Sequence, residues 1–415
     1  MNTKKIICLL LILFLFSCTN DTVSSESPKP EETEEAIEPE IYIAPTVKII
    51  SVSAGENHTL ALDDKGQVWA WGDNLYGQVG DGNFTNYLDF PQLEPEDEYY
   101  YDENINRRKD IDNDVYTPKL IMDNVKEIFA RAFGSFAITN DNKLYAWGKN
   151  DLTPEINATP TYIMDDVLYV DSSYNYNMPQ TFIIKTDNTL WFAGPIGFLN
   201  EGTFYSEPVC LYENVKKAVF DDSWPTGIVI LTTDNRLISY APEVMNSNNF
   251  IFKEITGLNN VVDISAGAEQ VYTLNTSGEV YGWGANGYEG RLGAMGDIYW
   301  IDEPIFIAAD IKKILHGQMF ITNENTLLVW GTIYWAYDSR TTQGQVGAGI
   351  TDELIVYGKT PVEILNNIAI ADGRRFHFIA VNNDGIVYTW GNNFYGQLGN
   401  GTSEDIIIPT PIIFP

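Results

Sequence analysis

Residues 49–82 read IISVSAGENHTLALDDKGQVWAWGDNLYGQVGDG, and the central part of this stretch decides the fold because it recurs along the chain. A tight-turn signature followed by an apolar run occurs seven times, and five of the runs end in Trp-Gly. The pivot residues of the turns are separated by 76, 46, 47, 43, 47 and 60 residues; they are Gly66, Asn142, Asn188, Asn235, Gly278, Asn325 and Gly385. A period of about 40–50 residues built from short strands is typical of a propeller or a repeat array. Seven such units can close into a ring, which removes exposed sheet edges.

Each copy has the residue pattern of a β-hairpin. The segments TLAL (59–62) and QVWAW (67–71) alternate as strands do when one face packs on a core. Gly or Asn at the pivot permits the positive φ of a tight hairpin turn. The tryptophans recur at one place in the repeat, where we expect them to pack between neighbouring blades, each burying on the order of 150–250 Å². The five pairs are Trp71-Gly72, Trp147-Gly148, Trp283-Gly284, Trp330-Gly331 and Trp390-Gly391.

The first copy and residues 370–401 also share a Gly-rich continuation, GQVGDG in one and GQLGNG in the other. Together with the Trp-Gly pairs, these segments resemble the repeat of the regulator of chromosome condensation family, over about residues 45–415. The resemblance implies an all-β fold, a seven-bladed β-propeller of four-stranded antiparallel blades. The chain ends in PTPIIFP (409–415), and we expect Ile412–Phe414 to pair into the first blade as a missing strand and so close the ring.

The N-terminal 44 residues differ in composition from the rest. Residues 1–18 have a basic start, an apolar run and a final Ser-Cys, which is typical of a secretory signal. The end of this segment resembles the lipobox of bacterial lipoproteins, which implies lipidation of Cys18. Residues 19–44 are rich in Ser, Pro and Glu, and we expect them to form a disordered acidic tether. These features predict a protein of the bacterial cell envelope, held by its lipid at the outer membrane or cell surface.

The net charge of −32 disfavours nucleic-acid binding, because an acidic surface repels phosphate backbones. The three cysteines, Cys8, Cys18 and Cys210, provide no disulfide framework. No Cys/His cluster suggests a metal site, and no motif suggests a cofactor. His58 and His377 occupy one repeat position on different blades, so we interpret them as structural.

Two insertions contain the candidate interaction residues. Residues 83–115 are acidic and contain the cluster Tyr99, Tyr100 and Tyr101. A long loop of this kind is either functional or disordered, and both interpretations remain open. Residues 332–343 contain Tyr334, Trp335 and Tyr337, and Trp300 belongs to an earlier inter-blade loop. These aromatic side chains either form a binding surface or cover blade edges.

We therefore expect a monomeric interaction platform that binds another protein and has no enzymatic activity. One alternative is a glycan-binding or polysaccharide-cleaving protein with an axial site. A second alternative, implied by the resemblance, is guanine-nucleotide exchange on a small GTPase.

Overall fold

The structure, a computed structural model, describes residues 47–84, 113–153, 155–175, 178–196, 203–221, 227–242, 250–267, 269–286, 292, 299–316, 319–329, 361–374 and 377–415. Residues 44–415 form one compact unit, separate from 1–43. Among the described residues, no helix has the length and apolar character needed to cross a membrane.

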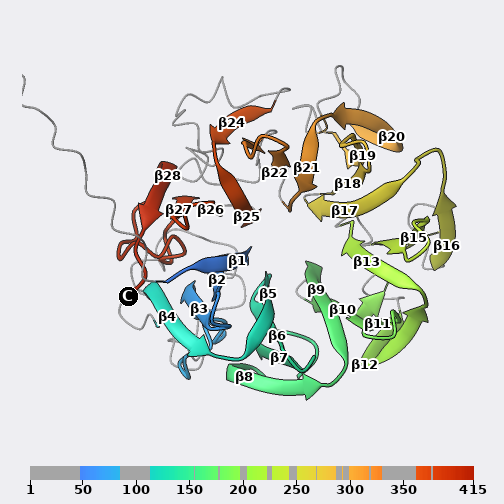
Figure 1. Cartoon of the computed structure of the whole chain (residues 1–415). Coiled ribbons are helices and arrows are strands. Elements are labelled where there is room, and N and C mark those ends of the chain that lie inside the picture. The colour runs from blue at the N-terminus through green and yellow to red at the C-terminus, as the bar shows by residue number, and fades with distance from the viewer. Residues whose placement is uncertain are drawn as a thin grey trace, which may run out of the picture. The chain divides into compact units, whose positions relative to one another are not determined.

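Within this unit the strands form seven four-stranded antiparallel sheets, each made of four consecutive strands (Figure 1). The fold is therefore the predicted seven-bladed propeller. The first three blades contain β1 (Ile49–Ala54), β2 (His58–Asp63), β3 (Val68–Gly72) and β4 (Val115–Met122); β5 (Val125–Arg131), β6 (Gly134–Thr139), β7 (Leu144–Gly148) and β8 (Asn157–Met164); β9 (Val167–Asn175), β10 (Met178–Lys185), β11 (Leu190–Ile196) and β12 (Thr203–Tyr212).

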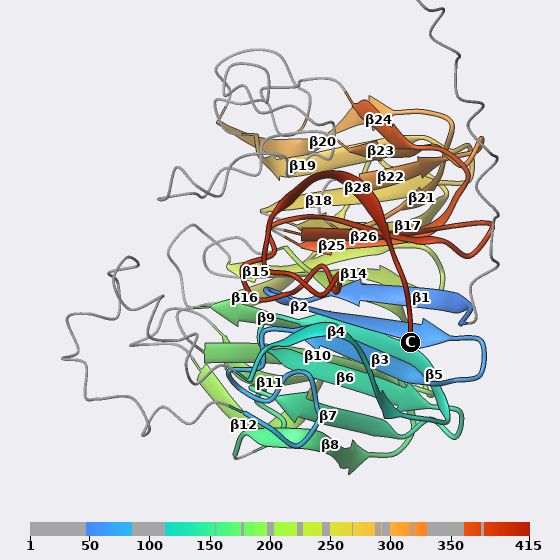
Figure 2. The same ribbon diagram turned by 90° about the vertical axis from the view of Figure 1, so that its left-hand side faces the viewer.

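The remaining four blades follow the same order. They contain β13 (Val215–Phe220), β14 (Ile228–Thr232), β15 (Leu237–Pro242) and β16 (Phe250–Ile255); β17 (Val261–Gly267), β18 (Gln270–Asn275), β19 (Val280–Ala285) and β20 (Trp300–Ala308); β21 (Ile311–Ile314), β22 (Met319–Thr322), β23 (Leu327–Val329) and β24 (Val362–Leu365); β25 (Ile368–Arg374), β26 (His377–Asn382), β27 (Val387–Gly391) and β28 (Ile406–Ile412). The first strand of each blade lies at the axis and the fourth at the rim, and Figure 2 shows the blades from the side.

The hairpin turns have the predicted backbone. All seven pivot residues have positive φ, from 62° at Asn235 to 85° at Gly385. These turns also join the blades, because the first residue of the next blade bonds to the pivot. The Val125 amide, for example, donates to the Gly66 carbonyl at 3.0 Å, and the Val167 amide donates to the Asn142 carbonyl at 2.9 Å. We call the end of the ring that carries these turns the hairpin face.

The tryptophans pack between blades as predicted. The Trp71, Trp147 and Trp390 side chains are fully buried. Trp147 Nε1 donates to the Gln78 carbonyl of the preceding blade at 2.9 Å. A Cβ atom at Gly80 would lie 2.6 Å from that same indole nitrogen, so the glycine of the Gly-rich loop makes room for the tryptophan. Trp283 packs partly buried between the fourth and fifth blades, and Trp330 and Gly331 lie outside the described residues.

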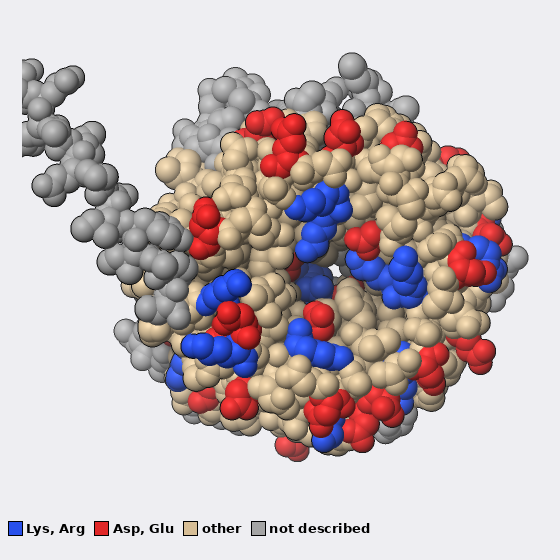
Figure 3. Space-filling view, in the orientation of Figure 1, with Lys and Arg blue, Asp and Glu red and all other residues tan. Residues whose placement is uncertain are grey.

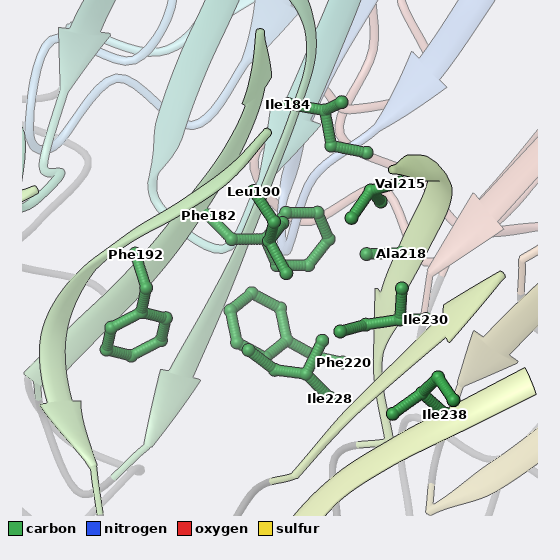
Figure 4. Packing of buried hydrophobic residues seen from close by; sticks show 10 residues of the cluster. All are labelled: Phe182, Ile184, Leu190, Phe192, Val215, Ala218, Phe220, Ile228, Ile230 and Ile238. Carbon is green, nitrogen blue, oxygen red and sulfur yellow. The ribbon is translucent and has the colours of Figure 1, made fainter. Parts of the chain in front are cut away.

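Where the tryptophan is absent, phenylalanine is prominent in the interface: the fourth blade has Tyr240 at the tryptophan position, and it packs against a cluster of phenylalanine and aliphatic side chains. Between the third and fourth blades, Phe182 and Phe220 pack with ring centroids 4.8 Å apart, and Phe192 lies beside them (Figure 4). Aliphatic side chains from both sheets fill the rest of this interface.

The expected closure by a strand of the first blade is wrong. Ile412 pairs with Val387 of β27, so β28 completes the seventh blade. The first blade already has its fourth strand, because β4 pairs with β3 directly after the 83–115 insertion. No strand position is left in that blade for Ile412–Phe414, and each blade is contiguous in sequence.

The ring closes instead through side chains at a closing seam between the seventh and first blades. Phe414 is buried edge-on against Trp69 and Trp71, at centroid distances of 5.6 and 5.8 Å. Trp71 Nε1 donates to the Gln397 carbonyl at 2.9 Å. The Gly401 amide donates to the Tyr116 carbonyl at 2.8 Å, which adds one backbone bond across the seam.

The two repeat histidines are structural, as predicted. His58 Nε2 lies 2.9 Å from Ser135 Oγ of the second blade, and His377 Nε2 lies 2.9 Å from Thr59 Oγ1 of the first. Both side chains are fully buried. Burial lowers the pKa of His58 to about 3 and that of His377 to about 4, so both imidazoles are neutral at pH 7.

Candidate functional site in the axial channel

The first strands of the seven blades surround an axial channel that contains a cavity of about 230 Å³. Its wall is formed mainly by the third and fifth residues of these strands, because alternate side chains of a strand point the same way. Polar and charged side chains are frequent among them, although the strands are otherwise apolar.

The middle of the channel contains a buried ion pair. Arg131 Nε lies 2.5 Å from Asp171 Oδ1, and the two side chains are 12% and 14% exposed. Arg131 Nη1 also donates to Ser53 Oγ at 3.1 Å, which ties the first three blades together. Burial disfavours the charged guanidinium, but the negative charges of Asp171, Tyr169 and Asp372 together outweigh it and raise the pKa of Arg131. Burial likewise raises the pKa of the neighbouring Tyr169, and Asp171 adds to the effect.

The mouth on the hairpin face is surrounded by lysines. Lys217 and Lys313 line the cavity, and Lys126, Lys216 and Lys312 each stand one residue before a channel-lining position. We call these five residues the lysine collar. Figure 3 shows Lys and Arg side chains gathered around the central opening, while acidic side chains are frequent toward the rim.

The collar lysines are held in different ways. Lys126, Lys216 and Lys312 each donate from Nζ to Oδ1 of the pivot asparagine in their own blade, namely Asn142, Asn235 and Asn325. Lys217 Nζ forms an ion pair with Asp263 Oδ1 at 2.6 Å. Lys313 has no hydrogen bond or ion pair among the described residues. Its side chain is exposed to the channel, whose walls remove water from around the ammonium and lower its pKa.

The opposite end of the channel has a different set of groups. Asp372 Oδ2 accepts from the Ala54 amide at 2.9 Å, and His316 Nδ1 lies 3.0 Å from the Gly373 carbonyl oxygen. Burial lowers the pKa of His316, and the Arg374 charge lowers it further. Nη1 of Arg374 is buried without a hydrogen-bond partner in the part of the chain that the structure describes.

Most of the candidate interaction residues proposed from the sequence lie outside the described residues. These are Tyr99, Tyr100, Tyr101, Tyr334, Trp335 and Tyr337, and Cys18 lies outside as well. Trp300 is described: it begins β20 at the rim of the fifth blade and is 40% exposed, beside Tyr299 at 58%. Trp300 is thus not part of the axial channel.

Sequence reasoning missed the channel residues. The available signal was a charged residue at the third position of an inner strand, as in VKE (125–127), VKK (215–217) and IKK (311–313). In the described residues, no group of three His, Cys, Asp or Glu side chains is arranged to hold a metal ion.

The first and last blades of the chain match a known repeat family. The pattern described as the regulator of chromosome condensation (RCC1) repeat matches residues 49–78, 370–397 and 384–415. The ultraviolet-B receptor UVR8 of Arabidopsis thaliana is 32% identical over 157 residues, which cover 36% of this chain and 33% of UVR8. Protein pim1 of Schizosaccharomyces pombe is 22% identical over 341 residues, 66% of this chain and 60% of pim1.

Other relatives are much longer than this chain. The E3 ubiquitin-protein ligase HERC2 of Homo sapiens is 30% identical over 200 residues, which make up 44% of this chain and 4% of HERC2. The chain therefore spans between 4% and 60% of the length of these curated relatives.

Solved structures with a similar arrangement include Prp20p from Saccharomyces cerevisiae, with a TM-score of 0.46, 19% identity and coverage of 88% of this chain and 76% of that one. The yeast protein RCC1 (Prp20) in a crystal structure with Kap60 gives a TM-score of 0.42, 19% identity and coverage of 88% and 74%.

Proposed function

This chain is a seven-bladed propeller with RCC1 repeats, and we propose that it binds another protein. We further propose, from its N-terminal sequence, that it is exported and anchored by a lipid. Yeast RCC1 (Prp20), one of the similar proteins, has been crystallised with Kap60 bound to it. Residues 1–18 and 19–44 supply the export signal and the tether of this proposal, and Cys18 is the lipidated residue. The protein would then be held in a bacterial cell envelope, at the outer membrane or the cell surface.

The observation that supports protein binding over catalysis is that two of the channel carboxylates, Asp171 and Asp263, are paired with cations; Glu127, which also lines the channel, is not one of these pairs. Asp171 is neutralised by Arg131, and Asp263 by Lys217. General acid–base catalysis needs a carboxyl group whose pKa lies near the working pH and which is free to exchange its proton. Carboxylates committed to cations are suited to holding the blades in place instead.

The proposal is tested by capturing a partner with the whole chain from envelope extracts of the source cells. A second bait lacks residues 84–114, and a third lacks 332–343. A partner is accepted when it also forms a complex with the purified chain. Capture by the whole chain and loss with one deletion assigns the binding loop, whereas no complex with any purified candidate contradicts the proposal.

Lipid anchoring is tested separately by labelling cells with a radioactive fatty acid. We expect label on the whole chain and none on the Cys18→Ser variant, which should also leave the membrane fraction. Equal labelling of both proteins would contradict the assignment of Cys18.

Glycan binding is a second candidate, favoured by the exposed pair Tyr299 and Trp300 on the rim. Aromatic faces at a surface are common in recognition sites because they bury much area at low entropy cost. Quenching of tryptophan fluorescence by envelope oligosaccharides, lost in Trp300→Ala, would support it. Nucleotide exchange, also implied by the resemblance, is measured as nucleotide release from a purified GTPase; it ranks last because an exported protein does not meet a cytosolic GTPase.

A further inference from the structure

The lysine collar is not required by the architecture of a blade. The second residue of the inner strand is lysine in the second, fourth and sixth blades only. In the other blades this position is occupied by aliphatic residues, namely Ile50, Leu168, Val262 and Ala369. A position that accepts an aliphatic side chain in four blades does not need an ammonium group in the other three for folding.

Hydrogen bonds nevertheless hold three of the collar lysines in fixed positions. Lys126, Lys216 and Lys312 each give one N–H to a pivot asparagine, which directs the side chain along the hairpin face. Lys216 gives a second N–H to the Val262 carbonyl at 3.1 Å. An ammonium group has three N–H donors, so up to two remain for a ligand on Lys126 and Lys312 and one on Lys216. Lys313 lies within the mouth with all its donors free of partners among the described residues.

The local charge is opposite to that of the molecule. The five collar lysines face two carboxylates at the same mouth, Glu127 and Asp263, so these seven side chains carry a net charge of +3. The whole chain carries −32. Burial raises the pKa of Glu127, because the channel wall removes water from around its carboxylate. The positive charges of the collar repel one another, and a negatively charged ligand relieves this repulsion, which favours its binding.

We propose that the lysine collar binds an acidic segment of a partner protein, with a carboxylate of that segment directed at Lys313. This assignment rests on the proposed function and names the chemistry of the partner. The collar surrounds the axial mouth, beside a cavity of about 230 Å³. A short run of Asp or Glu fits that size. A nucleic acid or a sulfated polysaccharide would extend beyond the collar onto acidic surface and be repelled.

The test uses an N-acetylated, C-amidated hexaglutamate peptide and the whole chain, with binding measured by isothermal titration calorimetry. We expect binding at low ionic strength that weakens at about 0.15 M salt, because exposed charges are screened there. Lys312→Glu combined with Lys313→Glu should weaken binding by roughly tenfold or more, which corresponds to about 1.4 kcal/mol.

The matched control is Lys65→Glu combined with Lys253→Glu. These lysines are exposed on the first hairpin turn and on the rim strand β16, and the control changes the net charge by the same amount. We expect less than a twofold effect from it. Lys312→Ala with Lys313→Ala, checked by circular dichroism for an intact fold, should also weaken binding without introducing new negative charge.

Equal weakening in the collar and control pairs would mean that only net charge matters and would overturn the proposal. So would the absence of peptide binding at low salt, or collar-dependent binding of a heparin hexasaccharide in place of the peptide. Peptide binding without any protein captured from envelope extracts would contradict the proposed function and leave the collar site standing. If a partner protein is still captured by the variant with the collar substitutions, the collar proposal is contradicted and the proposed function stands.

Discussion

Acidification should weaken the ring through its two repeat histidines. The pKa values of His58 and His377 are lowered from 6.5 to about 3 and about 4, because both imidazoles are fully buried between blades. A histidine whose folded pKa is lowered binds its proton more readily in the unfolded chain. Its contribution therefore reduces stability as pH falls below 6.5, and the loss continues until the folded pKa is reached.

The magnitude follows from the pKa difference. A pH of 5 lies about 1.5 units below the pKa of a histidine in the unfolded chain, and each pH unit in this range corresponds to about 1.36 kcal/mol. Each histidine should therefore cost about 2 kcal/mol of unfolding free energy between pH 7 and pH 5, and the pair about 4 kcal/mol. This is a large share of the total stability of a typical protein.

The assay is urea unfolding of the whole chain at constant ionic strength, followed by tryptophan fluorescence. The wild type is compared with the double variant His58→Gln and His377→Gln. Glutamine keeps an amide donor for Ser135 and Thr59, and it does not titrate. We expect the stability difference between the two proteins to change by about 4 kcal/mol from pH 7 to pH 5 in favour of the variant.

The interval from pH 8 to pH 7 serves as an internal control, because the folded histidines are neutral throughout and the unfolded ones are mostly neutral. Carboxylates titrate in both proteins and cancel in the comparison. Parallel loss of stability in wild type and variant from pH 7 to pH 5 would refute the assignment of these histidines as buried neutral groups.

Three further perturbations test the packing. Phe414→Ala should destabilise the ring by about 3–5 kcal/mol, because it removes a buried ring from the closing seam; an unchanged midpoint in urea unfolding would rule out that role. Gly399→Ala should reduce the stability of the ring more than Gly401→Ala. Both residues have positive φ, but a Cβ at residue 399 would lie 2.7 Å from Trp71 Nε1, whereas one at residue 401 would meet nothing closer than 3.7 Å. Equal thermal midpoints for the two variants would contradict this. Burial raises the pKa of Asp151 from 3.8 to about 6, and its Oδ2 has no hydrogen-bond partner among the described residues, so this group removes stability as the pH rises from about 4 to about 6. Asp151→Asn should accordingly stabilise the chain by about 3 kcal/mol at pH 8 and by less at pH 5, and a variant that is less stable at both pH values would show that the bond to Thr181 matters more.

The repeat features that depend on local sequence were predictable. A pivot that needs positive φ accepts Gly or Asn, so the seven turns could be found from single residues. A tryptophan at a fixed repeat position beside a Gly-rich loop indicated interblade packing, which Trp147 and Gly80 confirm.

The closure could not be predicted from the same pattern. A repeat shows which strands follow one another, but it does not show which strand begins a blade. Residues 115–122 are equally suited to end the first blade or to begin the second, and their pairing with β3 across the intervening residues 73–114 decides the matter. The channel residues were missed for a related reason: Lys126, Lys216 and Lys312 become neighbours of one opening only after the inner strands have been identified.

The contiguous blades have a consequence for how this chain tolerates rearrangement. Each described sheet consists of four consecutive strands, and adjacent blades are joined by short turns such as Asp123-Asn124. The polypeptide could therefore be circularly permuted, with a linker between the old termini and new ends opened at any of these turns, and every sheet would remain intact. Because each blade is one continuous segment, a duplication or deletion in the gene can add or remove one whole blade.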